Sequence, residues 1–209
     1  SNIATAKLGT VAVRFPKNKT LRKILKSMNF PLAIPSANKS SHISPVSAED
    51  VVQEFNNSIK VILNGGQCKI GLESTVVDLT SKPKILRPGL IEPTTISRVL
   101  KIKVTVNNSS KSIRAPGMLK RHYSPGIPMK LNQKEAKDNE AFIVFGKKYK
   151  KKKNIFNLSR KANLNVAAKN LYRILRIIKN KNYKMICVCS IPRTGIGLAI
   201  NDRLNRAAK

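Results

Sequence analysis

The sequence predicts an α/β protein with two units joined by a polar linker. Short apolar or β-branched runs alternate with amphipathic stretches over most of the 209 residues, a pattern typical of strands alternating with helices. Polar residues and turn formers replace this pattern at 107–130, and it restarts at Ala141. We therefore expect a first unit at residues 1–106, a linker at 107–130 and a smaller second unit at 131–209.

The composition is that of a globular chain with a core. Hydrophobic residues make up 41% of the chain. No run reaches the roughly 18 apolar residues of a membrane span, and no signal-peptide pattern is recognised. The three cysteines are odd in number and lack the usual zinc spacing, which indicates reduced thiols rather than disulfides or a metal site. We expect a cytoplasmic protein with no membrane contact.

The net charge of +31 leaves two interpretations open. So basic a chain favours a nucleic-acid-binding surface. However, lysine outnumbers arginine 29 to 12 and is scattered through both units, which favours a compositional drift that produces a generally solvated basic face. One dense run at 147–153, interrupted only by Tyr149, is expected to be a solvated loop. Attraction to RNA at low salt follows from either interpretation.

Apolar spacing and proline stops predict the first elements. Residues 10–15 alternate apolar and polar side chains and are expected to form a strand. Thr20 is the expected N-cap of an amphipathic helix at 21–29. Residues 32–34 are interpreted as the end of a short buried strand, which Pro35 ends because proline has no N–H to give to a ladder.

A capped helix and a hairpin follow. Ser47 is the expected N-cap of a helix whose inner face carries Val51, Val52 and Phe55, and residues 59–63 are expected to form a strand. The remaining elements of the unit are a hairpin of 71–79 with 84–89, which would present Ser74 beside Arg87, a helix from Thr94 or Thr95 to Leu100, and a strand at 102–106.

Two features of this unit point to a ligand. The loop after Pro35 carries five short hydrogen-bonding side chains, Ser36, Asn38, Ser40, Ser41 and Ser44. A strand that leads into a polar loop and then a helix is where α/β folds place ligands, although an ordinary turn explains the same residues. Arg14 lies inside a predicted strand, where a charge needs an anion or a carboxylate partner; the alternative is that Arg14 faces solvent.

The second unit is predicted to be a small parallel α/β domain. Its expected elements are strands at 142–145 and 185–189 and helices at 164–179 and 198–208. The turn at 195–197 lacks the third glycine and the context of a dinucleotide fingerprint, so no cofactor is expected there. In the linker, His122 is a lone histidine, for which a structural role is favoured over metal binding.

Five stretches, taken in order, resemble one family. They are Thr-Val-Ala-Val-Arg at 10–14, Pro-Ser-Ala-Asn-Lys-Ser at 35–40 with Ser44-Pro45, Gly-Leu-Glu-Ser-Thr-Val-Val-Asp at 71–78, Leu-Arg-Pro-Gly at 86–89, and Ala-Pro-Gly-Met at 115–118 with His-Tyr-Ser-Pro at 122–125. The chain resembles the Sua5/YrdC family, the L-threonylcarbamoyladenylate synthases, in its Sua5-type form. Gly-Leu-Ala-Ile-Asn-Asp-Arg-Leu at 197–204 extends the resemblance over nearly the whole chain.

The resemblance implies a fold and a reaction. The fold would be a partial YrdC-like twisted open α/β sheet domain, an ordered linker and a small Rossmann-like Sua5 domain. The enzyme would convert L-threonine, bicarbonate and ATP into threonylcarbamoyl-AMP and pyrophosphate, usually with Mg²⁺. Because the product serves the t6A37 modification of tRNA, contact with tRNA or with the t6A machinery is also expected.

The resemblance further implies roles for nine residues, none of them a covalent nucleophile or a metal ligand. Contacts to ATP or its adenylate are expected from Thr10, Ser36, Ser44, Arg87 and Tyr123. Contacts to threonine are expected from Arg14, Ser74 and, through its backbone, Ile34. Asn38 would brace the loop. Catalysis would then consist of positioning and charge neutralisation.

One departure from the family bears on activity. Family members carry an N-terminal segment with a basic Lys-x-Arg motif for the triphosphate, and no such motif precedes residue 10 here. We therefore expect this polypeptide alone to make little or no adenylate. It would be an excised piece of a longer chain, a truncated gene product, or one half of a split protein that a separate N-terminal fragment complements. The alternative is an incomplete module that binds RNA or a partner chain, although 5% aromatic residues without Trp offer few stacking platforms.

Overall fold

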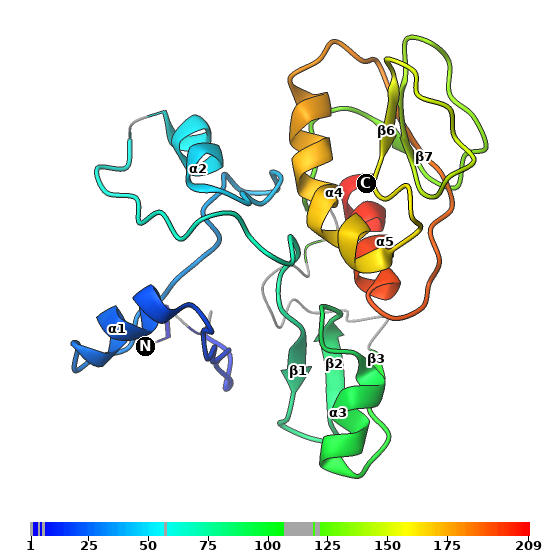
Figure 1. Ribbon diagram of the computed structural model, residues 1–209. Helices are drawn as coiled ribbons and strands as arrows, with labels where there is room; N and C mark the ends of the chain where they lie inside the picture. Colours follow the sequence, from blue (N-terminus) through cyan, green and yellow to red (C-terminus); the bar gives the residue numbers. More distant parts are fainter. Residues whose placement is uncertain (1, 4, 6, 57, 107–118, 120–121) are drawn as a thin grey trace.

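The described chain forms three groups of elements. A computed structural model describes residues 2–3, 5, 7–56, 58–106, 119 and 122–209. Two separate helices come first, a small sheet with one helix follows, and a larger α/β unit lies at the C-terminal end (Figure 1). Residues 107–118 of the predicted linker lie outside the described residues, so the unit boundary expected there stays a prediction.

The C-terminal unit is built on a four-stranded parallel sheet. Its strands are β4 (Met129–Lys130), β5 (Ala141–Val144), β6 (Ile155–Asn157) and β7 (Ile186–Val188), in the order β4-β7-β5-β6. The parallel α/β prediction for this unit is confirmed, and β5 and β7 lie within a residue or two of the predicted strands. Strands β4 and β6 have two and three residues, too few for a period of two to be recognised in the sequence.

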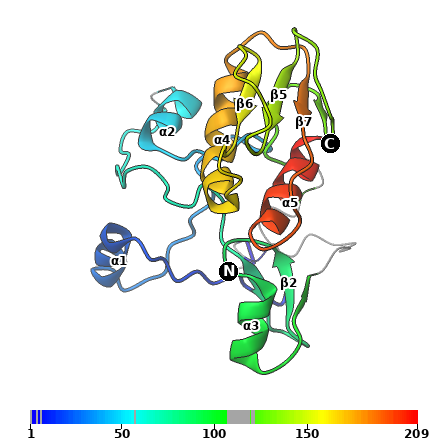
Figure 2. The same ribbon diagram turned by 45° about the vertical axis from the view of Figure 1, so that its right-hand side comes forward.

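Two helices cover one face of this sheet (Figure 2). Helices α4 (Leu164–Lys179) and α5 (Gly197–Ala207) share a core with Ile143 of β5 and Val188 of β7. Phe142 and Val144 point to a second cluster on the opposite face, as the alternation of side chains along a strand requires. The buried stripe of α4 includes Ala167, Ala168, Leu171, Tyr172, Ile174, Leu175 and Ile178.

The predicted hairpin is present in the small sheet. Strands β1 (Val76–Asp78) and β2 (Lys84–Arg87) pair antiparallel, and β2 pairs in parallel with β3 (Thr105–Val106) after helix α3 (Pro93–Leu100). Strand β1 is shorter than expected, and its register with β2 shifts between Val76 and Val77. Val76 pairs with Arg87, so residues 74 and 87 lie at the same end of the hairpin.

The first two helices correct the sequence predictions in detail. Helix α1 (Lys19–Lys26) is capped by Asn18, not Thr20: its Oδ1 accepts a hydrogen bond from the Leu21 N–H at 2.9 Å. Helix α2 (Ala48–Phe55) has the predicted cap Ser47. Of its predicted apolar inner face, Val51 and Phe55 are half-buried, but Val52 is 45% exposed, and the residue fully buried on α2 is Glu54.

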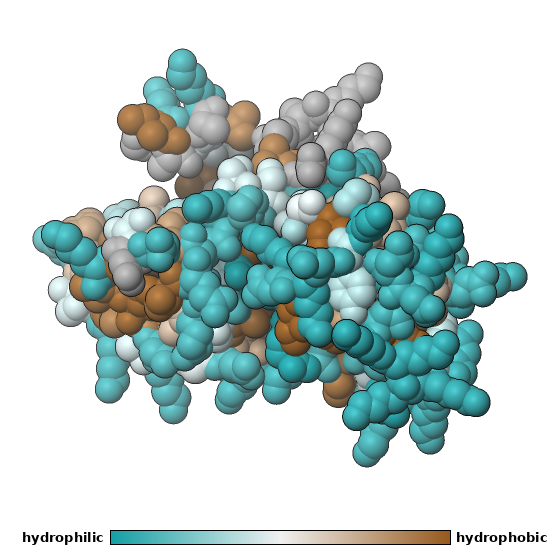
Figure 3. Space-filling view, turned by 90° about the horizontal axis from the view of Figure 1, so that it is seen from above, coloured by the Kyte–Doolittle hydropathy of each residue, from teal (hydrophilic) through white to brown (hydrophobic). Residues whose placement is uncertain are grey.

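Three predicted strands are not formed. Residues 10–15, 32–34 and 59–63 pair with no strand in the described part of the chain. Their apolar side chains are accordingly exposed: Val13 by 88% and Val61 by 75%. A period-two pattern specifies a strand only where another strand supplies the ladder, and none lies beside these segments. Seen from above, hydrophilic side chains cover most of the surface, with hydrophobic residues gathered in patches between them (Figure 3).

The cysteines and the helix lengths complete the description. The Cys68, Cys187 and Cys189 thiols are free, and the last two are buried in the C-terminal unit. Within the described ranges, no helix combines the length and hydropathy that a membrane crossing requires. The longest of them, α4, has 16 residues.

Candidate active site

Four of the predicted site residues lie together where the small sheet meets the C-terminal unit. They come from separate segments: the 36–44 loop, the entry to β1, the end of β2 and the segment after the linker. They are Ser44, Ser74, Arg87 and Tyr123. In the ribbon views this junction lies beneath α5, at the ends of β1 and β2 that face the C-terminal unit (Figures 1 and 2).

Arg87 holds the segment that enters β1. Its side chain is buried, with the residue only 3% exposed, and its Nε donates to the Ser74 carbonyl at 3.0 Å. Its Nη2 donates to the Ser74 hydroxyl at 3.4 Å. Burial lowers the pKa of the Arg87 guanidinium, and the charges of Arg203 and Arg14 lower it further. Ser74, the predicted threonine contact, and Arg87, the predicted ATP contact, therefore lie side by side in the hairpin.

Arg14 lies within electrostatic reach of this pair. Its charge contributes to the lowered pKa of Arg87, although Arg14 itself is exposed on the extended 10–15 segment. Thr10, Ile34 and Ser36 are also exposed, and no hydrogen bond within the described residues joins them to Ser74 or Arg87. Their predicted contacts stay predictions.

Glu73 connects the 36–44 loop to the C-terminal unit. The Ser44 hydroxyl donates to Glu73 Oε1 at 2.6 Å, the Tyr172 hydroxyl donates to Oε2 at 2.9 Å, and the Arg203 Nε donates to Oε2 at 3.0 Å. Burial alone would raise the pKa of Glu73, but the Arg203 charge and the Ser44 hydrogen bond outweigh it and lower the pKa. Glu73 is therefore a largely buried carboxylate whose two oxygens both accept hydrogen bonds.

Tyr123 offers an unused donor inside this cluster. The residue is 1% exposed, its ring stacks on Tyr172 at 5.6 Å between centroids, and the Arg203 guanidinium lies 5.5 Å from its ring centre. Burial raises the pKa of the Tyr123 phenol, so the hydroxyl stays protonated. No described residue forms a hydrogen bond with it. A buried polar group without a partner costs roughly 1–3 kcal/mol, which a ligand oxygen would relieve.

The 36–44 loop is braced from three sides. Asn38 Nδ2 donates to the Lys39 carbonyl at 2.8 Å and to the His42 carbonyl at 3.3 Å. Glu54 on α2 accepts a hydrogen bond from the Lys39 N–H at 3.0 Å and lies 2.9 Å from His42 Nδ1. From α4, Arg176 donates to the Ile43 carbonyl at 2.8 Å. The bonds of Asn38 are of the bracing kind expected for it.

Two family profiles together match nearly the whole chain. A family profile described as "Telomere recombination" matches residues 1–89. A second profile, described as "Threonylcarbamoyl-AMP synthase, C-terminal domain", matches residues 91–209. The chain belongs to the Sua5 family. The resemblance inferred from five short stretches is confirmed.

Individual relatives agree with this assignment. The threonylcarbamoyl-AMP synthase of Pyrococcus abyssi is 33% identical over 99% of this chain and 66% of its own length. That of Bacillus subtilis is 31% identical over 98% of this chain and 64% of its own length. The crystal structure of P. abyssi Sua5 complexed with L-threonine matches with a TM-score of 0.86 at 30% identity, covering 100% of this chain and 66% of that one. The chain thus spans less than two thirds of these relatives.

A second P. abyssi Sua5 structure concerns a variant in which a histidine and the tyrosine after it are replaced by alanine. It matches with a TM-score of 0.85 at 29% identity and is covered to 65%. In the present Sua5-family chain, a His-Tyr pair occurs at 122–123.

Three residues of this cluster, Glu73, Tyr172 and Arg203, were not expected from the sequence. Tyr172 lies in the apolar stripe of α4 and Arg203 lies on α5, and both contact Glu73. Tyr172 lies at a position that the helical period assigns to the core, so the sequence pattern gives no sign that its hydroxyl contacts Glu73. Arg203 stands inside the Sua5-like stretch at 197–204, which was the one indication available.

The described residues offer Mg²⁺ few protein ligands. They contain no group of three or more His, Cys, Asp or Glu side chains that could hold a metal. Glu73 is the carboxylate in the cluster, and its oxygens already accept hydrogen bonds from three side chains. Mg²⁺ in nucleotide sites is commonly bound by only one or two carboxylates together with phosphates and water.

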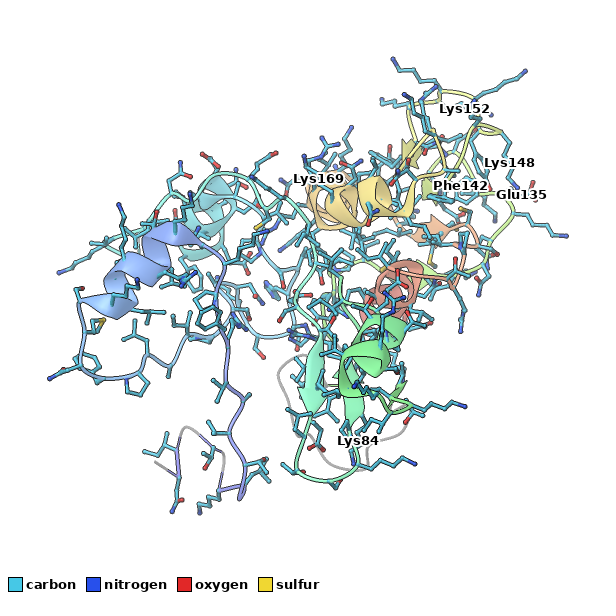
Figure 4. All side chains as sticks on the ribbon, turned by 60° about the horizontal axis from the view of Figure 1, so that its bottom comes forward. Lys84, Glu135, Phe142, Lys148, Lys152 and Lys169 are labelled. Atoms are coloured by element: carbon cyan, nitrogen blue, oxygen red, sulfur yellow. The ribbon has the colours of Figure 1, made fainter. Side chains whose placement is uncertain are left out.

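Gly71 allows the segment before Glu73 to lie directly on α4. Its φ is +77°, and a Cβ at this position would lie 2.7 Å from the Lys169 Cα and carbonyl oxygen on α4, where Figure 4 labels Lys169. Gly71→Ala is therefore expected to combine left-handed strain with a backbone clash and to destabilise the protein by roughly 2–4 kcal/mol. Urea unfolding followed by circular dichroism measures this loss.

Gly66→Ala is the matched control. Gly66 has the same φ of +77°, and a Cβ there would meet no atom within 4 Å. The control is expected to cost about 1 kcal/mol, from strain alone. Equal losses for the two variants would contradict the close approach to α4.

The lowered pKa of Glu73 predicts acid sensitivity. Since the folded-state pKa lies below the unfolded value of about 4.3, the stabilisation is present above that pH and is lost as the pH falls through the folded pKa. Glu73→Gln is expected to flatten the fall in thermal midpoint between pH 5 and pH 3. Burial lowers the pKa of His122, which removes stability in a separate window below about pH 6.5, so His122→Gln should leave the acid limb unchanged. An unaltered acid limb in Glu73→Gln would contradict the prediction.

Proposed function

We propose that this chain carries a threonylcarbamoyl-AMP synthase site with L-threonine, bicarbonate and ATP as substrates. The products would be threonylcarbamoyl-AMP, pyrophosphate and water. Membership of the Sua5 family supports this proposal. The observation that carries it is the convergence of Ser74 and Arg87 beside the buried, unpartnered hydroxyl of Tyr123.

The proposed chemistry needs positioning more than a protein nucleophile. The threonine amine attacks the carbonate carbon and water leaves; an oxygen of the resulting carbamate then attacks the α-phosphorus and pyrophosphate leaves. Arg14 would bind the threonine carboxylate through its forked N–H groups. Arg87 would bind phosphate oxygens, and Ser44 would do so by turning its hydroxyl proton from Glu73 to the phosphate. The Tyr123 hydroxyl would donate to the adenylate in a site from which water is excluded.

The remaining assignments complete this site. Ser74 would contact threonine together with the Ile34 backbone, Thr10 and Ser36 would contact ATP, and Asn38 would brace their loop. Mg²⁺ would accompany the ATP phosphates.

We further propose that full activity requires an additional polypeptide segment. The unpaired, exposed segments at 10–15 and 59–63 are where strands of that segment would add. On this proposal, the chain alone releases little or no pyrophosphate in the presence of threonine, bicarbonate and ATP. Efficient release by the purified 209-residue chain would contradict it.

Ser74→Ala tests the threonine assignment. A ligand at 100 times its Kd stabilises the folded state by about 2.7 kcal/mol, which shifts the thermal midpoint by several degrees. We expect L-threonine to raise the midpoint of the wild type and to lose this effect in Ser74→Ala. Ser81→Ala, an exposed serine in the turn of the same hairpin, is the matched control and should respond like the wild type. Equal responses of all three proteins would overturn the assignment.

Binding to RNA is a second candidate function, favoured by one observation. The lysines of the 147–153 run project from the end of the C-terminal unit, where Figure 4 labels Lys148 and Lys152, and within the described chain they form no ion pairs. They could contact tRNA phosphates. Binding of tRNA that falls steeply with salt and weakens when Lys150–Lys153 are replaced by glutamine would support this function. Unchanged binding in that variant would exclude the run as the contact.

A further inference from the structure

Arg203 of α5 is buried between the two units with its guanidinium fully engaged. The residue is 1% exposed. Its Nε donates to the Glu73 carboxylate at 3.0 Å, and its Nη1 donates to the Pro88 carbonyl at 2.7 Å and to Asp202 Oδ2 at 2.9 Å. Its Nη2 donates to the Glu73 carbonyl at 3.3 Å. One side chain of the C-terminal unit thus forms hydrogen bonds with two separate backbone segments of the small-sheet unit.

These two segments carry the proposed substrate contacts. Glu73 immediately precedes Ser74, and Pro88 immediately follows Arg87. Arg203 therefore fixes the carbonyl on one side of each contact residue, while Arg87 and Ser74 bond to each other between them. We infer that Arg203 is a positioning residue through which the C-terminal unit sets the geometry of the threonine- and ATP-binding segments. The inference rests on the proposed function of this site.

The chemistry of the contact suits this role. A buried guanidinium is costly unless its charge is paired and its donors are satisfied, and here Glu73 and Asp202 supply the charge. The planar fork of arginine can hold a carboxylate and two carbonyls in fixed directions, which a lysine ammonium cannot. In a chain with only ten acidic residues against 41 basic ones, Glu73 is thus engaged in fixing the hairpin, and only 18% of its side chain is exposed.

Other contacts of the C-terminal unit act in the same sense. The Tyr172 hydroxyl holds Glu73 Oε2, and Glu73 Oε1 in turn accepts the Ser44 hydroxyl. Arg176 on α4 donates to the Ile43 carbonyl, the residue before Ser44, and lies 3.5 Å from Glu54. Both loops of the proposed site therefore have backbone carbonyls fixed by arginines from the C-terminal helices.

Arg203→Gln in the full chain tests the inference, with Arg206→Gln as the matched control. Arg206 lies on the same helix and shares the partner Asp202, but it does not contact Glu73. Isothermal titration with L-threonine, at a temperature at which circular dichroism shows both variants folded, measures the affinity. We expect Arg203→Gln to bind threonine about ten- to a hundredfold more weakly than the wild type, the order of loss that misplacement of a site by about 1 Å produces. Arg206→Gln should bind like the wild type.

Two further variants make the outcome decisive. Tyr172→Phe removes only the hydroxyl that holds Glu73 and keeps the ring stacked on Tyr123, so it should fold and weaken threonine binding by a smaller factor. Arg203→Lys should give an affinity between those of the wild type and Arg203→Gln. A merely structural role predicts a lower thermal midpoint with unchanged affinity in all three variants, which would overturn the inference and leave the proposed function standing. Failure of the wild type to bind threonine would overturn both.

Discussion

Replacing Glu73 with alanine is expected to lower the free energy of unfolding by about 3–5 kcal/mol, because it leaves the buried Arg203 without its main counter-charge. The Arg203 side chain has no solvent exposure, and its Nε would lose its acceptor. The Tyr172 and Ser44 hydroxyls would lose their acceptor at the same time. A small domain has a total stability of roughly 5–15 kcal/mol, so the variant should be close to unfolding at room temperature. Urea denaturation followed by tyrosine fluorescence measures the change.

The double variant Glu73→Leu with Arg203→Met separates charge from packing. Removing both partners of a buried ion pair is far less costly than removing one, so the double variant should recover much of the lost stability. Glu135→Ala is the control: this exposed glutamate projects from the C-terminal unit in Figure 4, and its loss should change the stability by less than about 0.5 kcal/mol. A loss below 1 kcal/mol in Glu73→Ala would show that the pair contributes little to the junction.

Local pattern predicted those parts of the fold whose partners lie close in sequence. The hairpin of β1 and β2 follows from two β-branched runs around a short turn, and α4 follows from its apolar stripe. The same reasoning was wrong for residues 10–15 and 59–63. Both runs have residue types that favour a strand, but a strand also needs a neighbour, and no pattern within a segment says whether the chain supplies one.

The sequence predicted those contacts of the site that lie within its short motifs, and not the contacts between distant parts of the chain. Ser74 and Arg87 are 13 residues apart and meet through the hairpin register, so their proximity follows from the sequence. The contact of Glu73 with Arg203 spans 130 residues and two units, and nothing in either local pattern connects them. The burial of Glu54 on α2 could not be predicted for the same reason, because its partner Arg176 lies on α4, far away in the sequence. Where the prediction from helix amphipathicity failed, a long-range ion pair determines which side chain is buried.

Replacing Arg87 with glutamine is expected to abolish measurable binding of threonine and ATP, a loss of about a hundredfold or more. Arg87 is 3% exposed and holds both the carbonyl and the hydroxyl of Ser74, so its loss would displace the proposed threonine contact and remove the proposed phosphate contact together. Titration calorimetry with each ligand, at a temperature where the variant is folded, measures the effect.

The comparison with Arg87→Lys distinguishes charge from geometry. Lysine keeps the positive charge, but its ammonium cannot hold two oxygens of Ser74 and a phosphate oxygen in fixed directions, so it should restore little of the affinity. Arg98→Gln on α3 removes an equal charge from the exposed surface of the same sheet unit and should bind both ligands normally. Full recovery by lysine would mean that Arg87 acts as a general positive charge, and the forked contact to Ser74 would then have no part in recognition.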